Sequence, residues 1–187
     1  MKRNLKMLSV ALVLAGLIFS SCKKDKVEGN DEEVITTMQL TFVPSGGGTT
    51  LVYDYDDPDG PGGTAPTIDE IVLSPLKTYS VSLTLLNKTV TPAEDITTEI
   101  SGEAEAHRFY FAASASSNLL ISGLDDDPNG VPLGLTSSWT TGPAATGTVK
   151  ITLRHYPGTP PNKAIGDLVN STKSGTDIEV TFNTKIQ

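Results

Sequence analysis

Strict alternation of apolar and polar residues in four segments is the feature that most constrains the fold. The alternating apolar residues are Met38, Leu40 and Phe42; Tyr79, Val81, Leu83 and Leu85; Val149, Ile151 and Leu153; and Ile178, Val180 and Phe182. A period of two is typical of strands with one face in a core and the other in water. Glycine and proline clusters at Ser45–Gly48, Pro58–Gly63 and Pro157–Pro161 separate the segments as turns do. The pattern predicts an all-β protein, an antiparallel β-sandwich of about nine strands.

Alternation and turns together place the strands and a single short helix. The strands are expected at residues 34–43, 49–55, 68–73, 78–87, 107–113, 118–124, 134–141, 147–156 and 177–186. The helix is expected at about residues 92–105, because Thr91-Pro92-Ala93-Glu94 has the form of a capping box with proline at the first helical position. Ala93, Ile96 and Ile100 then follow at helical spacing.

Two acidic loops suggest an internal repeat. A shift of about 70 residues aligns Asp56-Asp57-Pro58-Asp59-Gly60 with Asp126-Asp127-Pro128-Asn129-Gly130. Each half of the chain would then hold four of the expected strands. Either a duplication of about 70 residues or independent use of the same turn chemistry explains the match.

The N-terminus has the features of a secretory signal that ends at a lipid-modified cysteine. Lys2, Arg3 and Lys6 precede the apolar run Met7–Phe19, and Cys22 follows two serines. The run is shorter than the ~20 residues of a spanning helix. We therefore expect a signal peptide at residues 1–21, a lipidated, disordered tether at 22–33 and one β-sandwich domain at 34–187. The expected location is the outer membrane, on the periplasm-facing side or at the cell surface, with N-terminal acyl chains in the membrane.

The charge balance argues against nucleic acid as a partner. The whole chain has 14 basic and 22 acidic residues, a net charge of −8. Removing the signal removes three basic residues, and the mature charge becomes 11 − 22 = −11. Such an acidic chain repels phosphate backbones.

Both histidines of the chain continue the apolar face of an expected strand. His107 begins one strand and His155 ends another. If successive strands alternate in direction, both lie at one end of the sandwich, and a Greek-key order places their strands side by side. Glu103, four residues before His107, would come from the end of the helix. Imidazole and carboxylate groups suit a divalent ion such as zinc or copper; the alternative is two unrelated histidines at the rim.

The second acidic loop also resembles the beginning of a calcium-binding loop. Asp125, Asp127 and Asn129 occupy positions 1, 3 and 5, and Gly130 occupies position 6. Position 12 is Thr136 instead of a bidentate glutamate. The alternative is a plain turn built from residues that turns favour.

The sequence lacks the usual signatures of catalysis. It contains no nucleophile elbow, no phosphate-binding loop and no dinucleotide fingerprint. Trp139, Tyr110 and Tyr156 are candidates for a ligand-binding surface. We expect a protein that is not an enzyme.

Several segments resemble a family of small, uncharacterised Bacteroidota outer-membrane lipoproteins, some of which carry a type 1 periplasmic-binding fold label. The segments include Thr91–Thr97, Glu105–Tyr110, Thr152–His155 and Thr176–Phe182. The resemblance implies an envelope location and, by analogy, an outer-membrane receptor as partner. The first functional hypothesis is a noncatalytic, lipid-anchored binding module that captures a metal ion or small metal complex. The alternative is a structural or interaction lipoprotein that binds another envelope protein or a glycan without metal.

Overall fold

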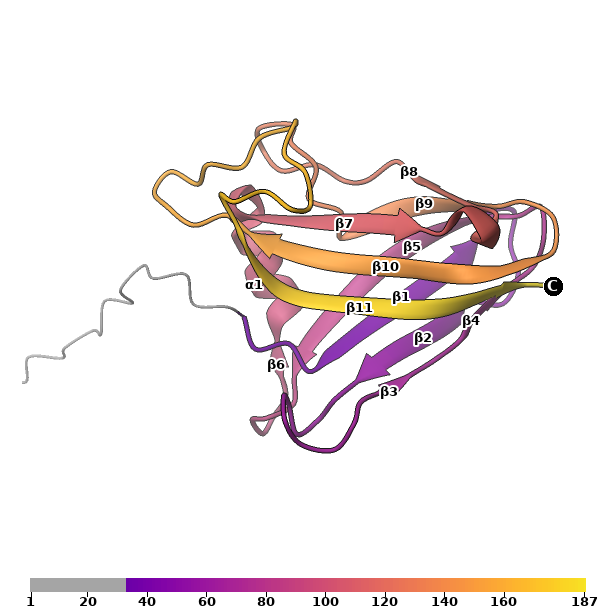
Figure 1. Cartoon of the computed structure of the whole chain (residues 1–187), viewed down its shortest axis with the longest axis horizontal. Helices are drawn as coiled ribbons and strands as arrows, with labels where there is room; N and C mark the ends of the chain where they lie inside the picture. The colour runs from indigo at the N-terminus through magenta and orange to yellow at the C-terminus, as the bar shows by residue number, and fades with distance from the viewer. Residues whose placement is uncertain (1–32) are drawn as a thin grey trace, which may run out of the picture.

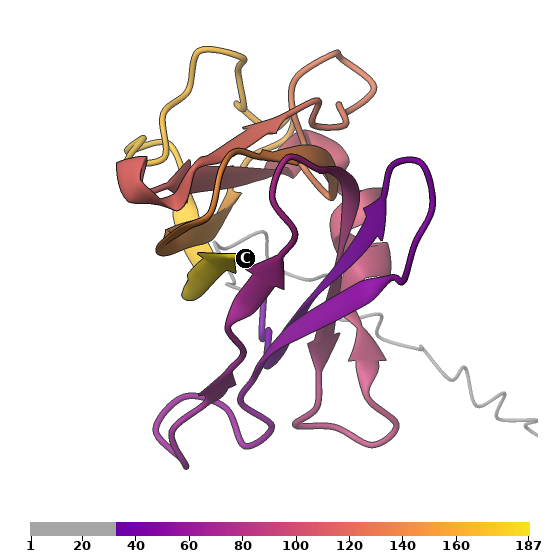
Figure 2. The same cartoon turned by 90° about the vertical axis from the view of Figure 1, so that its right-hand side faces the viewer.

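Two sheets pack face to face in the computed structural model, which describes residues 33–187. One sheet has seven strands, in the order β3-β2-β1-β5-β9-β8 with β6 also paired to β5; the other has four, in the order β4-β11-β10-β7. In Figure 1 the strands run across the view, and Figure 2 shows the two layers, with β10 and β11 in one and β1 and β2 in the other. The predicted β-sandwich class is confirmed. Among the described residues, no helix has the length and apolar character needed to cross a membrane.

The elements follow one another along the chain with short helical pieces in the middle. They are β1 (Thr37–Pro44), β2 (Leu51–Asp56), β3 (Thr67–Ile68), β4 (Ile71–Leu73), β5 (Thr78–Asn87), β6 (Glu94–Asp95), α1 (Ile96–Gly102), the 3-10 helix η1 (Ala104–Ala106), β7 (His107–Ala113), the 3-10 helix η2 (Ala115–Ser117), β8 (Leu119–Ser122), β9 (Thr136–Thr141), β10 (Ala145–His155) and β11 (Gly175–Ile186).

The expected strand at residues 68–73 is divided between the two sheets. β3 pairs with β2 in the first sheet, whereas β4 pairs with β11 in the second. At the crossing, Asp69 exchanges hydrogen bonds with Asp54: its backbone N–H donates to the Asp54 carbonyl at 2.9 Å, and its carboxylate accepts from the Asp54 N–H at 2.9 Å. The β4–β11 pair is parallel, in contrast to the antiparallel pairing expected throughout.

The helix begins later than predicted. Asp95 is its N-cap and accepts from the Thr98 N–H at 3.3 Å, so the capping box expected at Thr91 and Glu94 was wrong. Glu94 and Asp95 instead form β6 against the end of β5, where the Asn87 amide donates to the Glu94 carboxylate at 3.2 Å. Pairing with β5 holds these two residues extended, and the helix can start only after them.

The two halves of the predicted repeat share their acidic turn and one strand pairing, but they differ elsewhere. The Gly60 N–H donates to the Asp57 carbonyl and the Gly130 N–H donates to the Asp127 carbonyl, each at 3.0 Å, so the two acidic loops make the same turn. β1 pairs with β5 as β7 pairs with β10. The equivalence ends at the next strands, because β2 pairs with β1 whereas β8 pairs with β9 in the opposite sheet.

An aromatic cluster fills the space between the sheets. The Phe42 ring contacts those of Tyr53, Tyr79 and Trp139 edge to face, with centroids 5.7, 5.9 and 5.2 Å apart. Trp139 is fully buried, and its indole N–H donates to the Ser137 hydroxyl at 3.0 Å. The expectation that Trp139 lines a ligand surface was therefore wrong: it is a core residue.

The core location of Phe42 gives a first test of the fold. Phe42→Ala should lower the free energy of unfolding by about 3–5 kcal/mol, since it leaves a cavity among three aromatic rings. Its neighbour Val43, 48% exposed on the opposite face of β1, is the matched control, and Val43→Ala should cost less than about 1 kcal/mol. Urea denaturation of both variants measures the difference, and equal losses would contradict the assigned faces of β1.

Candidate metal centre

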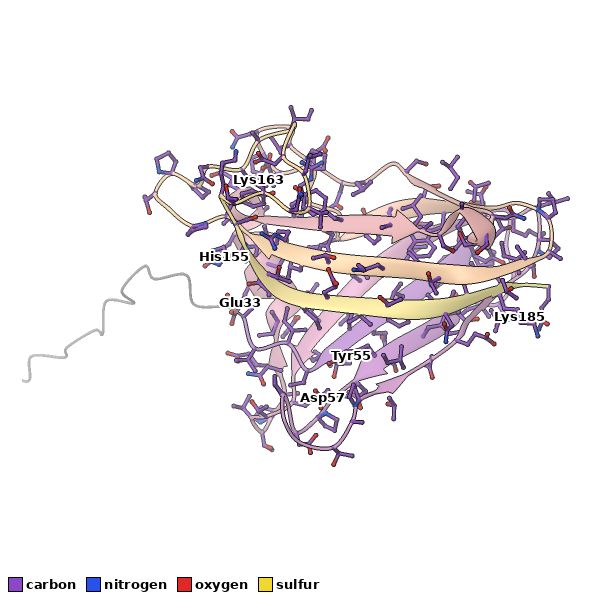
Figure 3. All side chains as sticks on the ribbon, in the orientation of Figure 1. Glu33, Tyr55, Asp57, His155, Lys163 and Lys185 are labelled. Atoms are coloured by element: carbon purple, nitrogen blue, oxygen red, sulfur yellow. The ribbon has the colours of Figure 1, made fainter. Side chains whose placement is uncertain are left out.

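Three strand ends bring the two histidines and a carboxylate together at one end of the sandwich, called here the histidine pole. His107 is the first residue of β7 and His155 is the last residue of β10, and the two are direct partners across the antiparallel pair. Direct partners project to the same face of a sheet. Figure 3 shows His155 at this end of the molecule, with Glu33 below it and Lys163 above. The predicted proximity of the two histidines is confirmed.

The two imidazole rings stack on each other. Their centroids lie 4.8 Å apart and their planes differ by 16°. His107 is fully buried, whereas His155 is partly buried. Among residues 33–187, neither His107 Nε2 nor His155 Nδ1 has a hydrogen-bond partner. A buried nitrogen without a partner is costly, and so each is a position where a ligand would be stabilised.

The hydrogen bond on the other side of His107 determines which of its nitrogens can bind a metal. Nδ1 lies 3.1 Å from the Glu103 carbonyl oxygen. A carbonyl only accepts, so Nδ1 carries the proton, and Nε2 of the neutral ring presents its lone pair. Nε2 lies 3.8 Å from Asp177 Oδ2, and both side chains are 0% exposed. Two ligand atoms of a tetrahedral zinc ion lie about 3.4 Å apart, so this separation is close to that of a shared metal.

Burial keeps the His107 ring neutral. Desolvation lowers its pKa to about 4; the Glu103 carbonyl raises it in part, and the nearby His155 and Lys163 charges lower it further. Metal ions bind the neutral form of imidazole. At neutral pH the ring is therefore in the protonation state that coordination needs.

Asp177 reaches His107 because of a bulge in β11. The register of β10 and β11 shifts between Leu153 and Arg154: Leu153 is opposite Ile178, and Arg154 is opposite Thr176. Asp177 is thus the extra residue, and a bulge changes the direction of the side chain it carries. Simple alternation with the buried Ile178 would place Asp177 in water, which is why the sequence analysis missed it.

Two further carboxylates lie beside His107. Ligand atoms of Glu33, Glu103 and His107 all lie within 4.8 Å of one another. Glu103, the predicted ligand, is exposed at the C-cap of α1 and does approach the histidine. Glu33 was assigned to the tether in the sequence analysis and was not considered. The histidine pole therefore combines an imidazole nitrogen with carboxylate oxygens that lie around the buried His107 ring.

The calcium-like loop lies next to the pole, with its side chains bonded to other protein groups. Asp125 Oδ1 accepts from the N–H groups of Gly134 and Thr136 at 3.1 and 2.7 Å. Asp127 Oδ1 accepts from the N–H groups of Asn129 and Val131 at 2.8 and 3.0 Å. These contacts describe a turn. Calcium binding at Asp125, Asp127 and Asn129 stays an untested prediction, and a cation there would compete with these hydrogen bonds.

A buried lysine joins the loop to the pole. The Lys163 Nζ lies 2.8 Å from Asp127 Oδ2, with both side chains 1% exposed, and it donates to the backbone carbonyls of Ala104 and His107 at 2.7 and 2.9 Å. Burial raises the pKa of Asp127, but the hydrogen bonds from Lys163 and from backbone N–H groups outweigh it, and the pKa lies below its usual value. A lysine within a proline-rich connection carries no sequence signal for this role, so the sequence analysis missed it.

The two tyrosines proposed as a binding patch are bonded to each other, with Tyr156 buried and Tyr110 partly buried. Tyr156 is fully buried, and its hydroxyl lies 2.6 Å from that of Tyr110. The Tyr110 hydroxyl also donates to the Asp167 carbonyl at 3.1 Å. They hold the β10–β11 connection, and the expectation of an exposed patch was wrong.

No protein-family model matches the chain, and neither the curated proteins nor the solved structures gave a match. The resemblance to Bacteroidota lipoproteins thus stays a prediction. The site is interpreted from its own geometry.

The buried ion pair gives a test of the structure around the pole. Lys163→Met should lower the free energy of unfolding by about 3–5 kcal/mol, because it leaves the Asp127 charge buried without its partner. Lys150 is the matched control: it pairs with Glu179 at 2.8 Å at the surface, and Lys150→Met should cost about 0–1 kcal/mol. Chemical denaturation checks both, and a Lys163 loss as small as the Lys150 loss would contradict the buried pairing.

The lowered pKa of His107 predicts an acid-sensitive stability in metal-free buffer. The unfolded ring takes up a proton as pH falls through about 6.5, whereas the folded ring stays neutral to about 4. The stabilisation is complete above the unfolded value and is lost as pH falls from about 6.5 towards 4. From pH 7 to pH 5 the wild type should lose about 2 kcal/mol more than His107→Gln. Urea titrations at both pH values measure this, and identical losses in the two proteins would contradict a buried neutral ring.

Proposed function

We propose that this protein is a lipid-anchored, noncatalytic binding module of the outer membrane that captures a divalent transition-metal ion at the histidine pole. The observation that carries the proposal is the meeting of the buried His107, the partly buried His155 and the Asp177 carboxylate at the ends of three strands. His107 Nε2 and His155 Nδ1 lack hydrogen-bond partners among the described residues. The Asp177 carboxylate lies 3.8 Å from the first of them.

The donor types favour zinc or copper over calcium at this position. Imidazole nitrogen with carboxylate oxygen suits zinc and copper, whereas calcium takes oxygen ligands almost alone. His107 is held by its Nδ1–H bond to the Glu103 carbonyl, as metal-ligating histidines usually are by their second nitrogen. Because the two rings are stacked, the partly buried His155 would have to turn its ring to bring Nδ1 onto the same ion. Glu33 and Glu103 supply negative charge beside the site.

The arrangement supports capture of the ion as the proposed role. The ligands come from three neighbouring strands, β7, β10 and β11. The sequence shows no nucleophile motif to accompany them. A metal ion or a small metal complex would be held at the membrane for transfer to a receptor.

The proposed anchor lies outside the described residues. The described chain starts at Glu33, at the histidine pole, and Cys22 and the proposed signal sequence precede it. The 11 residues from Lys23 to Glu33 reach at most ~40 Å when extended. An acyl anchor at Cys22 would therefore keep the pole within that distance of the bilayer surface.

Metal titration of the purified chain tests the proposal. Calorimetric titration with Zn²⁺ and Cu²⁺ at neutral pH should show one ion per chain with a Kd well below about 1 mM. His107→Gln, His155→Gln and Asp177→Asn should each weaken binding by at least about tenfold. Loss of a residue that only supports a metal ligand already costs about that much, and loss of a ligand should cost more. The absorption spectrum of bound Co²⁺ would report the nitrogen and oxygen ligands directly.

Glu179→Gln is the matched control. Glu179 lies on the same strand as Asp177 but is exposed and paired with Lys150, so its loss should leave the affinity unchanged. Binding no tighter than millimolar, or equal binding by the His107→Gln/His155→Gln double variant, would refute the metal site.

A further inference from the structure

The connection between β10 and β11, residues 156–174, exposes large apolar side chains at its turns. Ile165, Leu168 and Val169 are 70%, 68% and 41% exposed. The Asp167 N–H donates to the Ala164 carbonyl at 3.0 Å, and the Ser171 N–H donates to the Leu168 carbonyl at 2.9 Å, so two turns follow each other. Turn positions usually hold glycine, asparagine, aspartate or serine. Three apolar residues within five positions are a concentrated exposed patch, here called the apolar tip.

Cationic side chains hold the backbone beneath the apolar tip. One guanidinium nitrogen of Arg108 donates to the carbonyls of Ala164, Ile165 and Asp167 at 3.3, 3.2 and 3.3 Å. Arg154 donates to the Ser171 carbonyl at 3.0 Å. Four backbone carbonyls of the connection are thus held by arginine side chains, while the apolar side chains of the tip stay exposed.

The apolar tip projects from the same end of the molecule at which the described chain begins. Its base is fixed to the histidine pole by Lys163, which donates to the His107 carbonyl. Glu33, the first described residue, has its carboxylate within 4.8 Å of a His107 ring nitrogen. Val34, next to it, is 48% exposed. Figure 1 shows the connection and the start of the chain on the same side, and Figure 3 shows Glu33 and Lys163 there.

We propose that Ile165, Leu168 and Val169 insert into the surface of the phospholipid bilayer to which the chain is anchored. The inference rests on the acyl anchor of the proposed function, since the 11-residue tether supplies a high local concentration of membrane at this pole. Two membrane signals hold a protein more firmly than one acyl group. Because the mature chain is acidic, the contact depends on apolar burial and not on anionic lipid. Insertion of the apolar tip would turn the histidine pole towards the membrane.

Site-specific fluorescence on the lipidated protein tests the insertion. Acylated Cys22 leaves no other thiol in the mature chain, so Leu168→Cys can be labelled with an environment-sensitive NBD probe. Leu120→Cys is the matched control, because Leu120 is 64% exposed on β8, which follows the end of β7 far from the histidine pole. Both proteins are reconstituted into vesicles of phosphatidylcholine and phosphatidylethanolamine that contain nitroxide-labelled lipid. The probe at position 168 should shift to the blue and lose at least about half of its emission, whereas the probe at 120 should not change.

Flotation of the same vesicles separates failure of the inference from failure of the anchor. Protein that floats with vesicles, and is lost from them in Cys22→Ala, supports the anchor. If such protein shows equal emission at 168 and 120, the insertion of the apolar tip is refuted while the anchor stands. If the wild type does not float, the anchor is refuted and the insertion with it. Quenching that stays the same when the anionic lipid phosphatidylglycerol is added would support contact by apolar burial. Quenching that depends strongly on phosphatidylglycerol would refute apolar burial as the cause of the contact.

Discussion

The buried ion pair of Lys163 and Asp127 connects the parts of the molecule that matter for function. The ammonium group is shared among the carboxylate and the backbone carbonyls of Ala104 and His107. It therefore joins the acidic loop, the 3-10 helix before β7, the first residue of β7 and the β10–β11 connection. A charge buried this deeply is tolerated only with such a complete set of partners. The position of the histidine pole and that of the apolar tip both depend on it.

The histidine pole differs from the rest of the interior in its chemistry. Elsewhere the space between the sheets is filled by apolar and aromatic side chains with edge-to-face contacts. At the pole, the buried His107 ring and Asp177 carboxylate lie beside the partly buried His155 ring. Among the described residues, His107 Nε2 and His155 Nδ1 have no hydrogen-bond partner, and a buried polar atom without a partner costs free energy. A bound divalent ion would remove that cost, so capture of metal and stability of the pole would be coupled.

The two proposals together give the protein an orientation at the membrane. The described chain begins at the histidine pole, and the apolar tip lies beside it. With the apolar tip in the bilayer surface, the metal ligands lie at the membrane-facing end and the opposite end of the sandwich extends away from the lipid. Such an orientation would present a captured ion to a protein embedded in the same membrane.

The sequence by itself determined the class of fold and most strand positions, because side-chain alternation depends only on local strand geometry. The strands expected at 78–87 and 107–113 were predicted with the bounds that the structure has. The meeting of His107 and His155 followed from the same logic, since antiparallel strands that pair bring the start of one to the end of the other.

Tertiary structure alone decided the features that depend on pairing between distant segments. The bulge that brings Asp177 to His107 is a property of two strands in register, and neither strand carries it alone. The division of residues 68–73 between two sheets and the start of α1 after β6 likewise depend on strand pairing. The burial of Lys163 depends on its contact with Asp127, a residue 36 positions earlier (163 − 127). Local periodicity indicates which face of a strand is apolar, whereas packing between distant segments determines which polar groups come into contact in the protein interior.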